Sequence, residues 1–422
     1  MAPARSLLEL ASTIQAHTVA IDGALKSEAL PEPTFQSGGP PVFGLPASQE
    51  GDRVALLEAL EEMRALLMGP VPYIVLSAAS WTAYPGLLHV LYKFQIPQKL
   101  ELNERISYAE LGKRCGLTEA NTQHIVRTAI SLRFFEEPEK DIVMHNSFSQ
   151  ALATVPGVMD WVGFCAEDVL PAAAKWAECL KAYPESEDTT KTAFTMANGG
   201  QDGYFSLLDK DAQRQQRFAN GQGLIMAHPA RDPVHFVNSV DWSGDKCPQT
   251  VVDIGGSNGP LMAAILNKFP GIQQGVVQDL PGVVSQAQVP DGLQDRMSFE
   301  AYDFFTTQPR KADVRIFRVI LHDWPDADAI RILRNQIPVL EPGHRIILNE
   351  VVVEGSPDGR VVEDQQMWLS DVMMHLFFNA KERSRDDWVA LFAAADPRFH
   401  VESFTVVPPS VLSTIVVVWT GS

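Results

Sequence analysis

A histidine after an apolar run and two glutamates farther along the chain have the side chains needed for proton transfer. His322 follows "RVIL", Glu350 ends "RIILNE", and Glu382 lies in "AKERS". Free imidazole has a pKa of about 6.5, so a histidine can accept a proton at cellular pH from an activated hydroxyl. A carboxylate beside it would stabilise the imidazolium. From the residues alone, a lone histidine is more often structural, and both glutamates equally fit solvated surface charges.

The stretch "VVDIGGSNGP", residues 251–260, is typical of a strand that enters a glycine loop and then a helix. Its spacing departs from the G-x-G-x-x-G pattern of dinucleotide sites. Gly255 and Gly256 allow close backbone approach to a ligand. Asp253 would repel a pyrophosphate and suits a cation without phosphate, such as S-adenosylmethionine. A tight turn that binds nothing is the alternative.

Two further acids follow the next expected strands. Asp279 lies in "QDLPGVV", where a carboxylate can accept hydrogen bonds from both ribose hydroxyls of a nucleoside. Asp303 lies in "AYDFF", and Phe304 beside it could form an apolar wall for adenine. Acids at three successive strand ends favour a cofactor site over a simple turn.

Short runs rich in β-branched residues alternate with helical segments in the second half of the chain. This alternation predicts an α/β domain with a doubly wound, mostly parallel sheet. Ligands of such sheets bind at the carboxyl ends of the strands, where the acids and His322 fall. The runs are "TVVDIGG", "GVVQDL", "VRIFRVIL", "HRIILNEVVV" and "STIVVVW".

The N-terminal half is helical in pattern, with a Pro- and Gly-rich connector after residue 30. Ser107 and Thr118 are expected to cap two helices separated by Gly116, a pattern that is typical of a helix-turn-helix. "DIVMHNSFSQAL" would add a wing strand and a returning helix. DNA binding is one interpretation, and packing or dimerisation is the other. The net charge of -18 and the few basic residues on the second helix favour the latter.

The composition of the 422 residues limits the class of protein. Four widely spaced cysteines without a C-x-x-C pair predict a reduced protein, and no His/Asp cluster has metal-ligand spacing. We recognise no signal peptide and no uninterrupted apolar run of membrane-spanning length. We therefore expect a cytoplasmic protein with a small-molecule substrate, no nucleic-acid partner, no membrane partner and no metal.

Together the quoted motifs, with "FRVILHDWPDADAIRIL" and "KERSRDDW", resemble the class I S-adenosylmethionine-dependent small-molecule O-methyltransferases. The likeness is to the plant caffeate type, and especially to its fungal branch, over most of residues 80–420. It implies a Rossmann-like methyltransferase domain at 186–422 and a winged-helix-like dimerisation domain at 51–185. An N-terminal helix and connector would occupy 1–50. The resemblance also implies a homodimer.

The resemblance assigns roles to individual residues. It makes His322 the catalytic base, with Glu350 and Glu382 flanking the ring, orienting it and favouring its charged form. The cofactor S-adenosyl-L-methionine would contact Gly255, Gly256, Asp279, Asp303, Phe304 and Arg318.

The acceptor pocket is less defined by sequence. Met373, Met374 and Phe377 in "DVMMHLFF" could line it, although such a stripe more often packs a core. His145 is typical of the fungal members and could reach the pocket across domains. Members of the family often have a glycine pair before "KER", and this chain has Asn379 and Ala380 there, which leaves the acceptor open.

Two functions follow from the resemblance. The first is methyl transfer to a phenolic or enolic secondary metabolite. The second is a pericyclase on the same fold, which catalyses dehydration, cycloaddition or Alder-ene chemistry without methyl transfer. The intact set of His322, Glu350 and Glu382 favours the methyltransferase.

Overall fold

The structure, a computed structural model, describes residues 5–353 and 361–421. Within it, the chain forms two compact units that interleave along the sequence. Unit 1 comprises residues 1–174, 205–225 and 356–365, and unit 2 comprises 175–204, 226–355 and 366–422. The sequence predicts contiguous domains at 1–50, 51–185 and 186–422. These bounds differ from those of the two units and stay a prediction.

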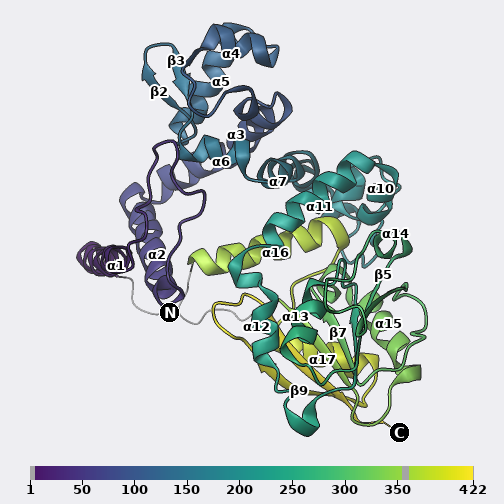
Figure 1. Ribbon diagram of the computed structural model, residues 1–422. Helices are drawn as coiled ribbons and strands as arrows, with labels where there is room; N and C mark the ends of the chain where they lie inside the picture. Colours follow the sequence, from purple (N-terminus) through teal and green to yellow (C-terminus); the bar gives the residue numbers. More distant parts are fainter. Residues whose placement is uncertain (1–4, 354–360, 422) are drawn as a thin grey trace. The chain divides into compact units, whose positions relative to one another are not determined.

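Unit 1 is mainly helical, as the sequence predicts (Figure 1). Its N-terminal helix α1 is capped by Ser6, whose hydroxyl accepts a hydrogen bond from the Glu9 backbone. Apart from the helix that starts at Val361 and continues into unit 2, the elements that begin in unit 1 are α1 (Leu7–Ser27), η1 (Ala47–Gln49), α2 (Glu50–Met68), α3 (Pro70–Lys93), η2 (Pro97–Lys99), β1 (Ile106–Ser107), α4 (Tyr108–Cys115), α5 (Glu119–Ser131), β2 (Glu136–Glu139), β3 (Ile142–Met144), α6 (Ser147–Thr154), α7 (Val158–Phe164), the π-helical turn η3 (Cys165–Val169), α8 (Leu170–Ala182) and α11 (Ala212–Met226).

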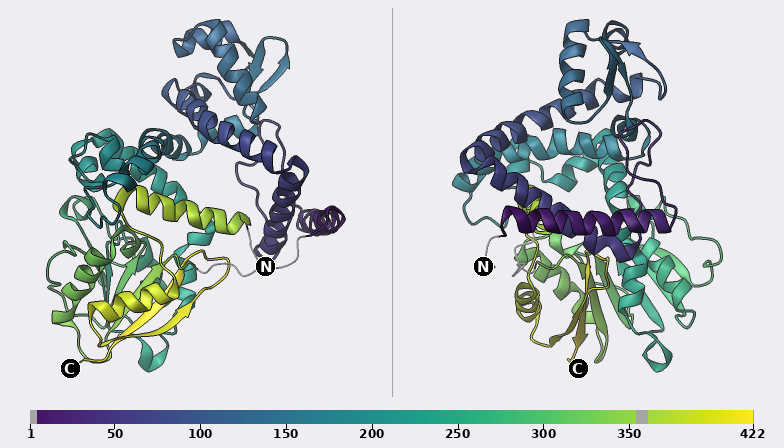
Figure 2. Two further views of the ribbon diagram at one scale, coloured as in Figure 1. Left: turned by 180° about the vertical axis from the view of Figure 1, so that it is seen from behind. Right: turned by 90° about the vertical axis from the view of Figure 1, so that its left-hand side faces the viewer.

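The helix-turn-helix prediction for residues 107–131 is confirmed. Ser107 caps α4, Gly116 ends it in the left-handed region with φ of 73°, and Thr118 caps α5. Strands β1, β3 and β2 form a small antiparallel sheet beside these helices, which completes the winged-helix arrangement (Figure 2). Arg127, the one Lys or Arg residue of α5, forms an ion pair with Glu137, with 2.6 Å between Nη2 and Oε1.

Helix α3 is the most apolar helix of unit 1 and is largely exposed within this chain. By length and composition it could cross a membrane, and only 11% of its apolar window is buried. A single such helix is weak evidence for a membrane span. Val71, Ile74 and Trp81 on this helix are among its exposed apolar side chains.

Unit 2 is built around a seven-stranded sheet in the order β6-β5-β4-β7-β8-β10-β9. Strands β4 to β8 pair in parallel, and β10 runs antiparallel to both of its neighbours. The sheet strands are β4 (Thr250–Ile254), β5 (Gln274–Asp279), β6 (Met297–Ala301), β7 (Val314–Arg318), β8 (Arg345–Glu350), β9 (Phe399–Thr405) and β10 (Ser413–Trp419). The doubly wound α/β prediction is confirmed, and β9 is a strand that the sequence patterns did not indicate.

Both faces of this sheet are covered by helices, so neighbouring strand residues are buried alternately on opposite sides. Helices α15 and α17 pack on one face with Val252, Phe317 and Ile346, and α12 and α13 pack on the other face with Val251 and Ile347. The remaining elements of unit 2 are α9 (Ala193–Ala197), α10 (Tyr204–Lys210), η4 (Pro229–Arg231), α12 (Pro233–Ser239), η5 (Gly244–Lys246), α13 (Pro260–Lys268), α14 (Pro281–Val284), η6 (Leu321–Asp323), α15 (Asp326–Gln336), η7 (Ile337–Val339), α16 (Val361–Phe378) and α17 (Arg385–Ala395).

Candidate active site

The turn after β7 places His322 at the carboxyl edge of the sheet. Val319 has φ of 56°, a conformation that a β-branched residue adopts only under strain, so neighbouring groups must hold this turn. The Glu350 carboxylate at the end of β8 does so. Its Oε1 accepts hydrogen bonds from the backbone N–H of Ile320 at 2.9 Å and of Leu321 at 2.8 Å. Glu350 therefore acts on the backbone that carries His322.

Glu382 contacts the imidazole ring directly. His322 Nδ1 lies 3.0 Å from Glu382 Oε1, and the same oxygen accepts a hydrogen bond from the Ser370 hydroxyl at 2.7 Å. An ionised carboxylate only accepts, so Nδ1 carries a hydrogen, and Nε2, which lies 3.5 Å from Asp323 Oδ1, is the nitrogen that gains or loses the second proton. Both side chains are buried, with 7% of His322 and 5% of Glu382 exposed.

The charges around His322 favour the imidazolium. Burial alone would lower the pKa of His322, but the carboxylates of Asp323, Glu382 and Glu350 raise it to about 10. Burial raises the pKa of Glu350 to about 7 and that of Asp323 to about 6. Burial opposes ionisation of Glu382 as well, yet His322 and Ser370 hold its pKa below the ordinary value. The stable pair is thus an imidazolium beside an ionised Glu382.

The glycine loop after β4 lies against the His322 turn. Gly255 has φ of 73°, and a Cβ there would come within 2.5 Å of Ile320 Cδ1. A Cβ on Gly256 would meet Asp253 Oδ2 at 2.5 Å. The Gly255 N–H donates to the Gln278 carbonyl at 2.7 Å, which ties the loop to β5. Only glycine fits at these positions, and the loop and the turn of His322 form one packed edge.

The acids expected to hold a cofactor end strands at this edge. Asp279, the last residue of β5, is half-buried, and its Oδ2 accepts a hydrogen bond from Ser257 N–H at 2.9 Å. Asp303 is exposed and accepts from Phe305 N–H at 2.9 Å. Phe304 is half-buried, with its ring centroid 5.8 Å from that of Trp324.

Asp253, near the end of β4, and Arg318, the last residue of β7, also lie at this edge. Asp253 is 1% exposed, and burial raises its pKa to about 7, against the effect of Arg318. Arg318 Nε donates to Asn349 Oδ1 at 3.0 Å, and its Nη2 donates to the Arg231 carbonyl. The carboxyl groups of Asp253 and Asp279 at this edge suit a cationic nucleoside, so the donor set fits S-adenosylmethionine.

The pocket residues expected on α16 differ in their surroundings. Phe377 is 2% exposed and packs between the rings of Phe194 and Tyr204, with centroids 5.0 Å and 4.9 Å away. This geometry favours core packing for Phe377. Met373 and Met374 are half-buried on the same helix and stay candidates for the pocket.

His145 lies in unit 1 and is fully buried there. Its Nδ1 is 2.8 Å from Ser149 Oγ, and its Nε2 lies 3.1 Å and 3.0 Å from the carbonyls of Pro97 and Leu100. Both ring nitrogens thus have local partners, which favours a structural role over the substrate contact expected from the sequence.

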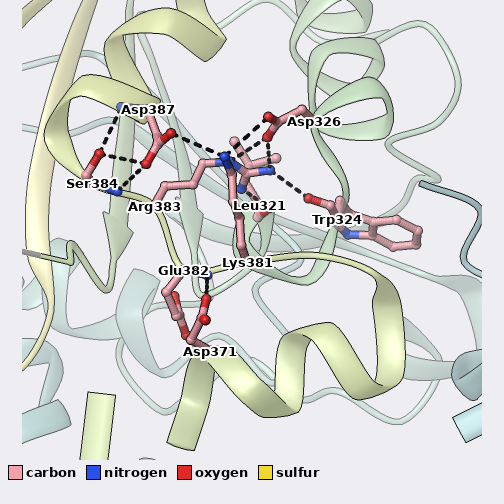
Figure 3. Close-up of polar contacts among 9 residues, drawn as sticks. All are labelled: Leu321, Trp324, Asp326, Asp371, Lys381, Glu382, Arg383, Ser384 and Asp387. Carbon is pink, nitrogen blue, oxygen red and sulfur yellow. Dashed lines mark hydrogen bonds and ion pairs between the residues drawn. The ribbon is translucent and has the colours of Figure 1, made fainter. Parts of the chain in front are cut away.

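Some residues of the site were not singled out by the sequence patterns. The Ser370 hydroxyl donates to Glu382 Oε1. Asp371 accepts a hydrogen bond from the Glu382 backbone N–H at 2.8 Å, a contact drawn in Figure 3. Arg231 acts electrostatically on Glu382 and Glu350. These three residues are hard to recognise in the sequence, because none of them is adjacent in the chain to the glutamate on which it acts. Among the described residues, no group of three His, Cys, Asp or Glu side chains could hold a metal ion.

The model of the O-methyltransferase domain family matches residues 176–396. The chain belongs to this family. It is 32% identical over 413 residues to the O-methyltransferase kk1A of Curvularia clavata, covering 98% of this chain and 97% of the relative. It is also 32% identical to a grayanic acid biosynthesis cluster O-methyltransferase of Cladonia grayi, over 98% of this chain and 88% of that one. The protein is therefore an O-methyltransferase of the kind found in fungal secondary metabolism.

Solved structures share the whole fold. OxaC has a TM-score of 0.74 at 19% identity, covering 97% of this chain and 100% of that chain. A structure described as a pericyclic reaction enzyme has a TM-score of 0.71 at 20% identity, with 97% and 100% covered, and LepI in complex with SAM matches equally well. At these identities the likeness concerns the fold. The family assigns S-adenosyl-L-methionine as the cofactor.

Proposed function

We propose that this O-methyltransferase methylates a phenolic or enolic hydroxyl of a secondary metabolite, with His322 as the general base. The contact of His322 Nδ1 with the buried carboxylate of Glu382 carries this proposal. Nδ1 is a donor in both forms of the ring, and the neutral form, which is the minor one below a pH of about 10, takes the proton of the acceptor hydroxyl at Nε2. The oxygen that loses its proton becomes the nucleophile.

The carboxylates make the proton transfer feasible. A phenol has a pKa of about 10, close to the pKa of about 10 of His322 in this cluster. Sharing of the proton between the acceptor oxygen and Nε2 is therefore nearly balanced in energy. Glu382 keeps the ring in the required tautomer, while Glu350 fixes the backbone turn on which the ring sits.

The residues expected to hold the cofactor are Gly255, Gly256, Asp279, Asp303, Phe304 and Arg318. When bound, S-adenosylmethionine supplies a methyl group already activated by its sulfonium. Asp279 would accept from the ribose, Phe304 would offer an apolar wall, and Arg318 would shape the floor through Asn349. Met373 and Met374 are proposed to contact the acceptor, because they lie half-buried a few residues from Ser370 on α16.

The test is a methyl-transfer assay with labelled cofactor and a panel of phenolic and enolic acceptors. We expect label in the product, together with S-adenosylhomocysteine, and a large loss of both with His322→Ala. Unlabelled isomer or dehydration product in place of methylated product would instead support pericyclic chemistry. Equal rates for the wild type and His322→Ala would overturn the role of His322.

We also propose that the protein is a cytoplasmic homodimer that buries the apolar side of α3 against a second copy. The exposed Val71, Ile74 and Trp81 support this, since large apolar patches on a chain usually mark an interface. Light scattering of the wild type should give the mass of two chains, and Ile74→Glu with Trp81→Glu should give that of one. A monomeric wild type that floats with phospholipid vesicles would contradict the proposal and favour membrane attachment.

A further inference from the structure

Arg383 is a fully buried arginine whose guanidinium is surrounded by acceptors from one short segment. Its Nη1 donates to the Leu321 carbonyl at 2.8 Å, and its Nη2 donates to the Trp324 carbonyl at 2.8 Å. Nε and Nη2 also reach Asp326 Oδ1 at 2.9 Å and 2.7 Å. Figure 3 shows these contacts converging on the guanidinium.

These acceptors lie on both sides of His322 in the chain. Leu321 precedes the histidine directly, and Trp324 follows it by two residues. Within the turn η6 the Leu321 carbonyl accepts one long hydrogen bond, from Trp324 N–H at 3.3 Å, and Arg383 gives it a second and shorter one. Asp326 opens α15, as expected for an acid at a helix N-terminus, and its carboxylate pairs with Arg383. Arg383 thus fixes the backbone before and after the ring.

The segment that carries Arg383 is itself anchored. The Arg383 carbonyl accepts a hydrogen bond from Val353 N–H at 3.0 Å, and the Glu382 N–H donates to Asp371 at 2.8 Å. Ser384 follows directly and caps α17 through Asp387. Adjacent residues of one rigid segment therefore hold the His322 ring and the His322 backbone.

We propose that Arg383 is a positioning residue that fixes the direction in which His322 Nε2 faces the acceptor. It acts through the backbone of the turn and touches no reacting atom. The proposal rests on the role of His322 as base.

The chemistry of the side chain explains why arginine is needed here. A planar guanidinium presents five N–H groups in fixed directions, whereas a lysine ammonium is a single point with three donors. Acceptors on three residues spread over one turn match the fork. The Arg383 Cζ also lies 5.0 Å from the centroid of the Trp388 ring, a stacking contact that an ammonium would not reproduce.

Arg315 offers a matched control within the same unit. It is fully buried, and its guanidinium donates to the carbonyls of Ala312 at 3.0 Å, Arg310 at 3.0 Å and Val339 at 3.2 Å. It lies near the start of β7, whereas His322 follows the end of that strand. Arg315→Lys therefore disturbs a comparable set of backbone carbonyls away from the ring.

The experiment compares Arg383→Lys with Arg315→Lys in the full-length enzyme. Thermal unfolding, cofactor affinity, kcat and the titration of His322 by NMR with labelled histidine are measured for each, with His322→Gln identifying the signal. The groups that set this titration are Asp323, Glu350 and Glu382, with Arg231 acting on the two glutamates.

We expect both variants to lose thermal stability. Only Arg383→Lys should lower kcat, by roughly 100-fold, because a shift of about 1 Å at the reacting group has this effect. Cofactor affinity should stay unchanged, and the titration midpoint of His322 should fall by about one pH unit. Millimolar guanidinium should restore part of the activity of Arg383→Ala.

A drop in melting temperature alone, with native kcat and native His322 titration, would reduce Arg383 to a structural role and overturn the proposal. If Arg383→Lys does not fold, Asp326→Asn can be used, because it removes only the charge partner of Arg383. It should change kcat and the His322 titration in the same direction but to a smaller extent. A shifted His322 titration in a protein that transfers no methyl group would confirm that Arg383 acts on the His322 turn, but it would reject the role of His322 as base and overturn the proposal with it.

Discussion

Two histidines, His145 in unit 1 and His322 in unit 2, are both buried, and their surroundings give them opposite properties. Neutral groups saturate His145, and burial lowers its pKa. Glu382 is the hydrogen-bond partner of His322, and three carboxylates raise its pKa to about 10 despite burial. The depth of burial therefore says little about the role of a histidine. The role depends on the charge of the groups around the ring and on whether one ring nitrogen is available to exchange a proton.

The same contrast extends to the elements around each ring. His145 lies between β3 and α6, and its partners Ser149, Pro97 and Leu100 all belong to unit 1. Glu382, from the segment before α17, contacts the His322 ring and is itself held by Ser370 of α16, while Glu350 at the end of β8 holds the backbone of the turn. Asp323 beside the ring in the chain adds a further negative charge.

The largest expected effect comes from removing the base. His322→Ala should lower kcat by about 10²- to 10⁴-fold, the usual contribution of a positioned general base. Cofactor affinity, measured by calorimetry, should change little, because His322 is expected to act on the acceptor. A parallel loss of cofactor affinity would show that the ring supports the cofactor site instead.

The next effect concerns the charge beside the ring. Glu382→Gln keeps an oxygen for Nδ1 and removes the carboxylate, which should lower the pKa of His322 by about 1–3. In the wild type the ring stays protonated until the pH reaches about 10, so kcat/KM should rise from neutral to alkaline pH. In the variant the rise should end at a lower pH, and the maximal rate should be roughly 10- to 100-fold smaller.

The raised pKa of His322 also has a consequence for stability. Its contribution is fully present below the unfolded pKa of about 6.5 and is lost as the pH rises toward about 10. Unfolding of Glu382→Gln followed from pH 6 to pH 10 should show less of this loss than the wild type. An unchanged pH profile in both activity and stability would contradict the electrostatic role of Glu382.

A smaller effect is expected at Asp253. Burial disfavours its carboxylate, and the charge of Arg318 only partly offsets this effect. Its pKa is raised from 3.8 to about 7, so stability due to the neutral form is lost as the pH rises through about 7. Asp253→Asn should therefore raise the melting temperature at pH 8 and leave it nearly unchanged at pH 4. It should weaken cofactor binding by roughly 10-fold, because one charged partner is lost. Unchanged affinity would remove Asp253 from the site.

The smallest catalytic effect is expected at His145. His145→Leu leaves Ser149 and the carbonyls of Pro97 and Leu100 without their partner, which should cost about 1–3 kcal/mol of stability. The kcat of the folded enzyme should stay within about 2-fold of the wild type, because both ring nitrogens of His145 bond to groups of unit 1. A large loss of kcat with an unchanged melting temperature would show that His145 reaches the acceptor after all.

The sequence by itself determined the elements that follow local rules. The caps at Ser107 and Thr118, the left-handed Gly116 and the runs that became β4, β5, β7, β8 and β10 were all readable, because capping and apolar periodicity act within a few residues. Asp279 and His322 could be placed at one edge for the same reason, since the ends of parallel strands meet there.

Only the tertiary structure decided which side chains meet. His322 and Glu382 are 60 positions apart, and no pattern in either segment indicates that Nδ1 lies 3.0 Å from Oε1. The sequence suggested a similar role for Glu350 and Glu382, and the fold divides them between the backbone of the turn and the ring. It also surrounds His145 with neutral partners and aims Arg383 at the carbonyls beside His322. Such contacts depend on how whole elements pack, because the energy that fixes them is shared among residues far apart in the chain.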